Sequence, residues 1–333
     1  MTSSKIRWGI IGCANIAIKS VIPAIQQSQT GEVVAIASRG LDKARETAEQ
    51  CGIPKAYGSY EELLADDSID AVYIPLPNHL HLEWTIRAAE AGKHVLCEKP
   101  LALTAQEAER MVQACEKAGV LLAEAFMYRH HPRYERIKQV IESGEIGEIR
   151  GIRGAFTFSN EADKTNVRCR AEWGGGGIYD VGCYPINAAR LLLGLEPEAV
   201  TSHAFFSPEH DNVDMMASGL LEFPGGVALT FDCGMWAYPR NTLEIVGTKG
   251  RIDVPNAFVQ TPGKDGFNVV VGEEVRYESL GWLDHYTLQI DDFGKSIRGE
   301  QPLRFAPSDA VKNMRVLEAC LQSAKERKRI VIQ

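Results

Sequence analysis

The first third of the chain repeats a short, almost continuously apolar run followed by an amphipathic segment. Apolar runs of this kind are typical of parallel strands that are buried on both faces. Strands that alternate with helices predict a doubly wound α/β sheet. The expected strands are residues 6–12, 33–38, 71–76, 94–98 and 120–126, and the expected helices are residues 15–28, 41–51, 60–65, 79–91 and 104–118.

The pattern changes near residue 125, where the regular alternation of strands and helices ends. Short strand-like segments follow, separated by Pro/Gly turns, and they predict a large open sheet that is mostly antiparallel. We therefore expect two domains, an N-terminal nucleotide-binding domain over residues 1–124 and a C-terminal α/β domain over residues 125–333, with the last helices packing back on the first domain. The expected elements of the second part are helices at 133–143, 177–193, 285–299 and 308–328 and strands at 149–159 and between 200 and 276.

Composition narrows the class of protein. The chain has 333 residues, a formal net charge of −8 and no basic block, which argues against non-specific nucleic-acid binding. None of its eight cysteines forms a CxxC pair, so we expect reduced thiols rather than a disulfide framework. No signal-peptide pattern and no apolar stretch of about 18 residues is present, so we expect a cytoplasmic protein without a membrane partner.

A glycine-containing turn follows the first expected strand. A Rossmann dinucleotide fold needs a tight turn there, so that the backbone approaches the pyrophosphate at a helix N-terminus. The fingerprint G-x-G-x-x-G/A is matched by Gly12, Ala14 and Ala17. Because alanine stands at the second position, the motif alone leaves two alternatives open, a dinucleotide site and an ordinary α/β turn.

The end of the second expected strand bears on the choice of cofactor. An enzyme that prefers NAD usually carries Asp or Glu there, whereas this chain has Ser38 and Arg39, with Lys43 four residues further on. An arginine pairs well with the 2′-phosphate of NADP. The absence of an acidic residue favours NADP(H), although NAD(H) remains possible and a solvated surface arginine is the alternative.

The fourth expected strand ends abruptly at Glu98-Lys99-Pro100. The residue before a proline avoids the α region, so Lys99 is expected to be extended. It stands at the carboxyl end of a parallel strand, where open α/β sheets bind ligands. The alternative is a surface lysine paired with Glu98.

Four consecutive glycines, Gly174–Gly177, precede a predicted helix. Glycines permit close approach of the backbone to a ligand. Asp180 and Tyr184 stand four residues apart on that helix and so share one face. A carboxylate and a phenol beside a ligand are suited to proton transfer. The alternatives are a flexible glycine loop and a tyrosine that only packs.

At these residues the sequence resembles the glucose-fructose oxidoreductase/inositol dehydrogenase (Gfo/Idh/MocA) family. The resemblance covers essentially the whole chain. Five stretches carry it in the same order as in the family: residues 8–17, 73–103, 124–132, 174–187 and 288–297. The Glu-Lys-Pro element together with the glycine-aspartate helix is its most specific part. The resemblance implies a nucleotide-binding Rossmann domain followed by an α/β domain that is built on an open antiparallel sheet.

The resemblance also implies roles for individual residues. Lys99 matches the family lysine beside the nicotinamide and the reacting carbonyl or alcohol, and Pro100 matches a proline often preceded by a cis bond. Asp180 matches an aspartate that contacts substrate hydroxyls. Inositol dehydrogenases carry histidine where this chain has Tyr184, so the motif is closest to the NADP-dependent xylose dehydrogenases and dimeric dihydrodiol dehydrogenases. In that branch tyrosine is the general acid/base and lysine assists.

Further site residues follow by position in these motifs. The expected catalytic residues are Lys99, Tyr184 and Asp180, and Arg168 and Trp173 are expected to join them in binding substrate. The four histidines near residues 79–81 and 130–131 lie in two separate segments without ligand spacing, so no metal site is expected. The expected cofactor-binding residues are Gly12, Ala14, Asn15, Ile16, Ser38, Arg39, Lys43, Leu76, Pro77, Asn78, His81, Glu98, Lys99 and Arg129.

We therefore expect an NADP-dependent oxidoreductase that moves a hydride to or from a carbinol or carbonyl carbon of a sugar, keto-sugar or cyclic alcohol. A trans-dihydrodiol dehydrogenase and an NAD-preferring inositol-type enzyme are the alternatives among enzymes. A redox sensor that binds NADP(H) without turnover is the alternative from another class. Family members commonly pair through the open sheet, so a homodimer or homotetramer formed through the C-terminal sheet is expected.

Overall fold

The computed structural model describes residues 5–332, which fold into two compact units. The first unit, here unit 1, comprises the chain up to His130 together with Asp284–Val311. The second, unit 2, comprises His131–Leu283 and Lys312 onward. The boundary expected after residue 124 thus falls after His130, and a later segment returns to the first unit.

Unit 1 is built on a six-stranded sheet in the order β3-β2-β1-β4-β5-β6, with every neighbouring pair parallel. This is the doubly wound topology that the continuous apolar runs predict. Residues of β4 and of β5 after His94 are all buried, as strands covered on both faces must be. The strands are β1 (Ile6–Ile11), β2 (Gly31–Ala37), β3 (Lys55–Tyr57), β4 (Ala71–Ile74), β5 (His94–Cys97) and β6 (Leu122–Glu124).

Helices connect these strands, because parallel neighbours need a crossover between them. α5 shows why the boundaries lie where they do: Thr104 accepts a hydrogen bond from the Glu107 N–H at its start, and Gly119 ends it at φ +70°. The helices of unit 1 are α1 (Ile22–Gln27), α2 (Leu41–Cys51), α3 (Tyr60–Leu64), α4 (His81–Glu90), α5 (Ala105–Ala118) and α8 (His285–Ile297).

Helix α8 completes the core of unit 1 although it lies about 150 residues beyond the rest of that unit in sequence. Ile290 and Phe293 join the core cluster of β1, β2 and α1, and the rings of Trp8 and Phe293 are 5.9 Å apart. The Asp291 carboxylate accepts hydrogen bonds from the Ser28 hydroxyl at 2.6 Å and from the Thr30 N–H at 3.2 Å. Both apolar and polar contacts therefore fix this helix to the start of the chain.

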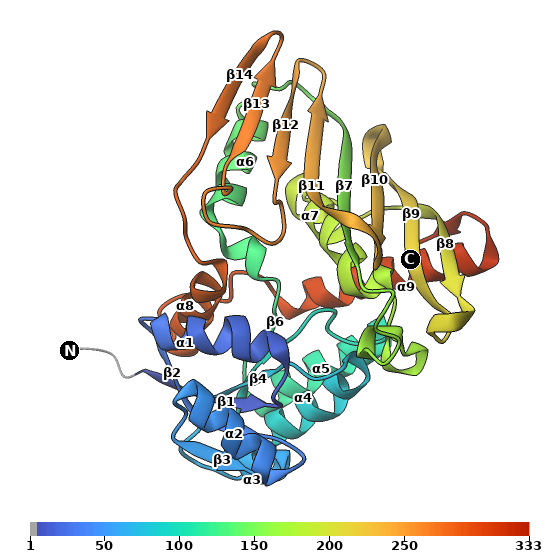
Figure 1. Ribbon diagram of the computed structural model, residues 1–333. Coiled ribbons are helices and arrows are strands. Elements are labelled where there is room, and N and C mark those ends of the chain that lie inside the picture. The colour runs from blue at the N-terminus through green and yellow to red at the C-terminus, as the bar shows by residue number, and fades with distance from the viewer. Residues whose placement is uncertain (1–4, 333) are drawn as a thin grey trace. The chain divides into compact units, whose positions relative to one another are not determined.

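Unit 2 is built on a nine-stranded sheet in the order β14-β13-β12-β11-β7-β10-β9-β8-β15, most of which is visible edge to edge in Figure 1. All neighbours are antiparallel except β7 and β10, which run parallel. The strands are β7 (Ile149–Ser159), β8 (Ala199–Ser207), β9 (Val213–Phe223), β10 (Val227–Gly234), β11 (Trp236–Gly247), β12 (Gly250–Pro255), β13 (Phe267–Val271), β14 (Glu274–Glu278) and β15 (Ile330–Val331).

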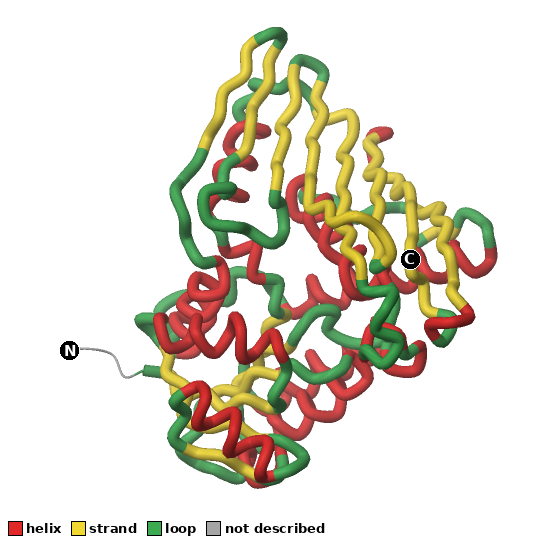
Figure 2. The backbone as a smooth tube through the Cα atoms, viewed as in Figure 1, coloured by secondary structure: helices red, strands yellow, loops and turns green. Residues whose placement is uncertain are grey.

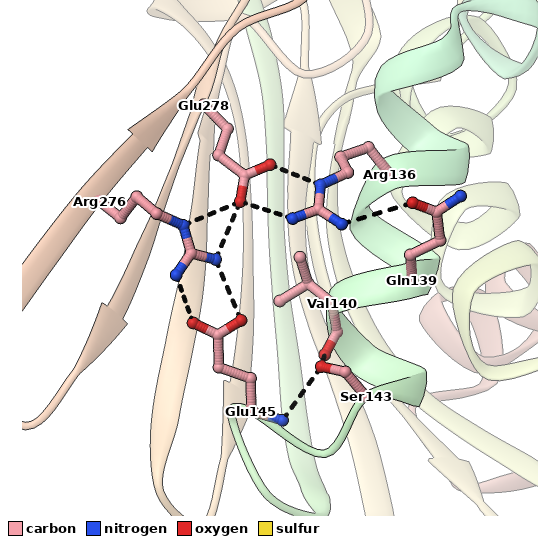
Figure 3. A network of polar contacts seen from close by, with 7 residues as sticks. All are labelled: Arg136, Gln139, Val140, Ser143, Glu145, Arg276 and Glu278. Carbon is pink, nitrogen blue, oxygen red and sulfur yellow. Dashed lines mark hydrogen bonds and ion pairs between the residues drawn. The ribbon is translucent and has the colours of Figure 1, made fainter.

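The helices of unit 2 are α6 (Pro132–Glu142), α7 (Cys183–Leu193) and most of α9 (Pro307–Glu326), drawn in red in Figure 2. Side chains tie α6 to the outermost strand β14, as Figure 3 shows. Glu278 accepts a hydrogen bond from Arg136 Nε at 2.6 Å and from Arg276 Nε at 3.0 Å, and Arg276 donates to Glu145 at 2.6 Å. These four charges anchor an edge strand whose other residues are exposed.

The structure departs from the expected elements at three places. The three-residue strand β3 was not expected, because its residues are only partly buried and carry no apolar run. Strand β15 was also not expected, and it pairs with β8 through Ile330 and Val331. The helices expected at 15–28 and 177–193 each contain a five-residue π-helical turn near their start, at Ala17–Val21 and Ile178–Gly182. π-Turns are frequent at functional sites.

Candidate functional site

The glycine turn after β1 has the geometry that its sequence predicts. Gly12 has φ +114°, a conformation that L side chains rarely adopt, and its N–H donates to the Ala37 carbonyl at 2.9 Å. A Cβ at this position would lie 2.9 Å from Cδ2 of Leu76. Ala14, Asn15 and Ile16 follow in the turn, and the Ala14 carbonyl accepts from the Ile18 N–H at 3.1 Å as the helix begins. Glycine is therefore the residue that fits at position 12, between the ends of β1, β2 and β4.

The end of β2 presents a hydroxyl and two cations. The Ser38 N–H donates to the Tyr57 carbonyl of the neighbouring strand at 3.2 Å, which fixes the backbone there. Arg39 is exposed. Lys43 is exposed as well and has a loose ion pair with Glu46, with 3.9 Å between Nζ and Oε2. The carboxyl end of β2 therefore presents exposed cationic side chains that suit an anionic group.

The loop after β4 is held by a buried histidine. Leu76 and Pro77 lead into a short 3₁₀ turn, Asn78–Leu80. His81 is fully buried, and its two ring nitrogens lie 3.0 Å from the Pro100 carbonyl and 2.8 Å from the Leu76 carbonyl. Burial lowers the pKa of His81 to about 4, so the ring is neutral and donates to one of these carbonyls. His81 thus links this loop to the loop after β5.

The Glu-Lys-Pro element lies at the carboxyl end of β5, and the peptide bond between Lys99 and Pro100 is cis. The Glu98 carboxylate accepts a hydrogen bond from the Tyr73 hydroxyl at 2.6 Å and from the Lys99 N–H at 3.2 Å. The following residue, Leu101, donates its N–H to the Glu124 carboxylate at 2.9 Å. Carboxylates from β5 and β6 therefore fix the backbone on both sides of Lys99.

Arg129 occupies a buried position in unit 1. Its side chain is only 6% exposed and forms an ion pair with Asp309, with 2.7 Å between Nη1 and Oδ2. The guanidinium carbon lies 3.6 Å from the centre of the Phe305 ring. One face and one edge of the guanidinium are thus used by the protein. This placement favours a structural role over the cofactor contact implied by its motif.

In unit 2, the structure brings together two of the residues expected to bind substrate. Asp180 lies in the π-helical turn at the start of the helix, with a side chain that is 15% exposed. Arg168 Nε donates to Asp180 Oδ2 at 2.7 Å. Arg168 is 43% exposed, so its outer nitrogens reach solvent. The pair combines a fixed carboxylate and a cation, a suitable arrangement for binding hydroxyl groups. Trp173 lies in the next 3₁₀ turn and is 38% exposed.

Tyr184 lies at the start of α7 in an aromatic environment. Its ring centre is 5.2 Å from that of Phe156 on β7 and 5.5 Å from that of Phe258, and these two rings stack on each other at 5.6 Å. Tyr184 is 5% exposed. Asn241 holds the Phe258 segment by accepting from the Phe258 N–H at 2.8 Å and donating to the Val259 carbonyl at 2.7 Å. Sequence reasoning missed Phe156 and Phe258, because isolated phenylalanines carry no motif.

The glycine run before this helix is required by packing within the protein. A Cβ at Gly175 would overlap the Arg168 carbonyl, and one at Gly176 would overlap the Asp214 carboxylate. At Gly177 it would lie 2.9 Å from the Gly234 Cα. The expected close approach thus occurs, but it is to neighbouring protein atoms. Lys99 belongs to unit 1, whereas Asp180 and Tyr184 belong to unit 2.

Residues 5–332 also bear on two other kinds of site, metal centres and membrane spans. In this part of the chain, no group of three or more His, Cys, Asp or Glu side chains is arranged to hold a metal ion. None of the helices described there is both long and apolar enough to span a membrane.

Family models match both halves of the chain. Residues 6–126 match the oxidoreductase family with an NAD-binding Rossmann fold, and residues 134–253 match the GFO/IDH/MocA C-terminal domain. The two matches together cover most of the chain, the first containing the whole six-stranded sheet and the second the larger part of the nine-stranded sheet.

Individual relatives agree with the family models. An uncharacterized oxidoreductase, ORF334 of Rhizobium meliloti, is 43% identical over 96% of this chain and 97% of its own length. A D-xylose 1-dehydrogenase (NADP(+)) of Haloferax volcanii is 39% identical, again over 96% of this chain and 97% of its own. A 3-ketoreductase from Actinomadura kijaniata, solved with NADP and TDP-benzene, has a TM-score of 0.91 at 33% identity and covers 96% of this chain and 98% of its own. The chain therefore belongs to the Gfo/Idh/MocA family of oxidoreductases.

Proposed function

We propose that the protein is an NADP-dependent oxidoreductase of a sugar, keto-sugar or related cyclic alcohol. The observation that carries this proposal is the Asp180 carboxylate, which accepts a hydrogen bond from Arg168 and lies in the π-turn that continues into the helix of Tyr184. A hydroxyl-binding carboxylate thus precedes a phenol suited to proton transfer. The xylose dehydrogenase is named as NADP-dependent, and the ketoreductase was solved with NADP and a TDP compound. Both relatives support this substrate class.

Unit 1 has the features that a bound NADP needs. The turn at Gly12 lets the backbone approach a pyrophosphate, and the exposed Arg39 and Lys43 beside Ser38 suit a 2′-phosphate. NADP would supply the hydride acceptor or donor. The protein residues that hold it would be those of the turn and of the β2 and β4 ends: Gly12, Ala14, Asn15, Ile16, Ser38, Arg39, Lys43, Leu76, Pro77 and Asn78.

The proton that accompanies the hydride requires a side-chain partner. We assign the proton transfer on the substrate oxygen to the Tyr184 hydroxyl, with Asp180 and Arg168 orienting neighbouring substrate hydroxyls. We give Lys99 an assisting role, as the resemblance implies, because an ammonium group beside a substrate oxygen polarises it. Solved structures of the ketoreductase include variants of one tyrosine and one lysine, the same two residue types.

The first experiment follows nicotinamide absorbance with NADP⁺ and NAD⁺ separately, over aldoses, polyols, inositols and dihydrodiols, and with NADPH over keto-sugars. Turnover with NADP(H) supports the proposal, and the best substrate identifies the branch. Turnover with NAD⁺ alone contradicts the cofactor assignment. Tight NADPH binding without turnover on any compound would instead indicate a redox sensor.

A tyrosine pair tests the role of Tyr184. Tyr184→Phe is expected to lower kcat by about 10²–10⁴-fold and to leave NADPH affinity unchanged, because only the proton donor is lost. Tyr134→Phe is the matched control, since Tyr134 is also buried in unit 2 and its hydroxyl donates to the Ala257 carbonyl at 2.9 Å. The control retains full kcat if the loss at Tyr184 is chemical.

We also propose that the enzyme forms a homodimer or homotetramer through the open face of the unit 2 sheet. A groove crosses this face and is lined by charges of both signs, among them Arg153, Asp232, Arg240 and Glu244. A self-complementary surface of this kind suits a symmetric partner. Sedimentation that shows only monomer at micromolar concentration would contradict this assembly.

We place the enzyme in the cytoplasm. All eight cysteines are free, and six of them are buried. Unpaired thiols are the rule in a reducing compartment.

A further inference from the structure

A buried carboxylate, Asp214, lies at the start of β9 outside every motif described above. Asp214 is 2% exposed. Its Oδ2 accepts a hydrogen bond from the Ile178 N–H at 2.6 Å. Ile178 is the first residue of the π-helical turn that continues without a break into α7. Asp214 therefore contacts the beginning of the helix that carries Asp180 and Tyr184.

This helix has no cap of its own. The first N–H groups of a helix lack intrahelical partners and need an acceptor, and the helix dipole makes a negative group favourable there. The residue at the N-cap position is Gly177, which has no side chain to supply one. The Asp214 carboxylate, 36 residues further along the chain, provides the missing acceptor.

The loop before the helix is shaped around the same carboxylate. Gly176 has φ +113°, and a Cβ there would overlap Oδ1 of Asp214. At Gly177 a Cβ would lie 3.3 Å from the Asp214 carbonyl oxygen. Two of the four glycines thus make room for Asp214, which gives the glycine run a specific structural purpose.

The buried surroundings of Asp214 disfavour the charged form of its carboxyl group. Burial raises the pKa of Asp214 to about 7, and the N–H groups of Ile178 and Gly177 oppose that rise. Burial raises the pKa of the Cys233 and Cys320 thiols, and the negative charge of Asp214 raises it further. Both thiols therefore stay neutral. The positive charge of Lys325 also lowers the pKa of Asp214. Burying a carboxyl group costs free energy, and the hydrogen bonds from the backbone N–H groups offset part of that cost.

We propose that Asp214 is a positioning residue that fixes the start of this helix and thereby the orientation of Asp180 and Tyr184. Asp180 lies two residues after Ile178, within the π-turn itself, and Tyr184 lies one turn further on. The kinetic consequence rests on the proposed function, because it needs these two side chains to act on substrate. The effect of Asp214 on the start of the helix does not depend on the proposed function.

The test compares Asp214→Asn and Asp214→Ala with the wild type. Asparagine keeps one carbonyl oxygen as an acceptor, whereas alanine keeps none. Hydrogen exchange of peptides that cover residues 174–187 reports the helix start, and NADPH titration reports unit 1. Steady-state kinetics separates kcat from KM. Glu278→Gln is the matched control, since it weakens unit 2 at the Arg136–Arg276 network and contacts neither α7 nor the glycine run.

We expect Asp214→Ala to accelerate exchange selectively at residues 177–184 and to lower kcat by about 10²-fold, because misplacing a reacting group by about 1 Å costs that much. The kcat of Asp214→Asn should be about tenfold higher than that of Asp214→Ala, because asparagine keeps one acceptor oxygen. The affinity for NADPH should stay unchanged in both. Glu278→Gln should lower thermal stability and leave kcat and the exchange of residues 177–184 unchanged.

The remaining outcomes separate the two proposals. If the wild type turns over no compound, the proposed function is wrong. The role of Asp214 is then decided by hydrogen exchange alone, and unchanged exchange at residues 177–184 in Asp214→Ala would overturn it. If the wild type is active and Asp214→Ala keeps its kcat within about threefold, Asp214 does not position the site. Should Asp214→Ala fail to fold, Asp214→Asn carries the same test, because it keeps the volume of the side chain and removes one acceptor oxygen. Undisturbed exchange and kcat in that variant would overturn the proposal.

Discussion

The clearest test of a single site residue concerns Arg129, whose motif implies a cofactor contact and whose position in the structure favours an ion pair. The perturbation is Arg129→Met, which keeps the length and the apolar stem of the side chain but removes the charge. The variant leaves the Asp309 carboxylate without this partner at 2.7 Å and removes the cation from the Phe305 ring at 3.6 Å.

The magnitude follows from the exposure of the two partners. Breaking a fully buried ion pair from one side costs about 3–5 kcal/mol. The Asp309 side chain is 30% exposed, so water recovers part of that loss. The cation–π contact adds about 1 kcal/mol, partly offset by the methionine stem. The expected loss is about 3 kcal/mol, which corresponds to a fall in Tm of about 6–12 °C for a unit of this size.

The assay is calorimetry on the wild type, Arg129→Met, Asp309→Asn and the double variant, with an NADPH titration of each. We expect the two single changes to be strongly non-additive, because both remove the same ion pair. NADPH affinity should change by less than about threefold. An NADPH affinity that falls by about tenfold or more while Tm stays within about 2 °C would contradict a structural role and restore Arg129 as a cofactor residue.

Two other predictions concern unit 1. Lys55 Nζ donates to Asp66 at 2.8 Å and holds the pKa of Asp66 well below its ordinary value, so the stabilisation is complete above about pH 4 and is lost as the pH falls through the lowered pKa. Asp66→Asn should therefore lower Tm at pH 7, and the difference from the wild type should shrink below about pH 4; equal Tm values at pH 7 would contradict it. Arg39→Ala should weaken NADP⁺ binding by about tenfold and NAD⁺ binding by less than about threefold, as measured by fluorescence titration, and an equal effect on both would rule out a 2′-phosphate contact.

Local sequence signals predicted the first sheet well. The strands around Ile10, Val72 and Leu96 are apolar on both sides, and this pattern has few alternatives to a buried parallel sheet. The turn at Gly12 was also predictable, since only glycine adopts its φ without strain. The resemblance to the family added the expectation that Asp180 binds substrate together with Arg168 and Tyr184.

Contacts between distant parts of the chain were not predictable in the same way. Asp309 lies 180 residues from Arg129, and Asp214 lies 36 residues from Ile178, so no local pattern connects them. The short strand β3 shows the same limit, since its pairing with β2 is decided by the neighbouring strand and not by its own residues. The sequence therefore indicated the backbone and the chemistry of the site, whereas the side chains that hold it required the structure.

The return of α8 to unit 1 has a consequence for how the protein is made. A ribosome releases the chain from its N-terminus, and domains generally fold as they emerge. Trp8 cannot meet Phe293, nor Ser28 meet Asp291, until almost the whole chain has been synthesised. One part of the apolar surface of the first sheet therefore stays exposed to solvent while the nine-stranded sheet is being translated. A nascent chain of this kind should depend on chaperones during synthesis, and a gene fragment that stops at His130 should yield an aggregation-prone product.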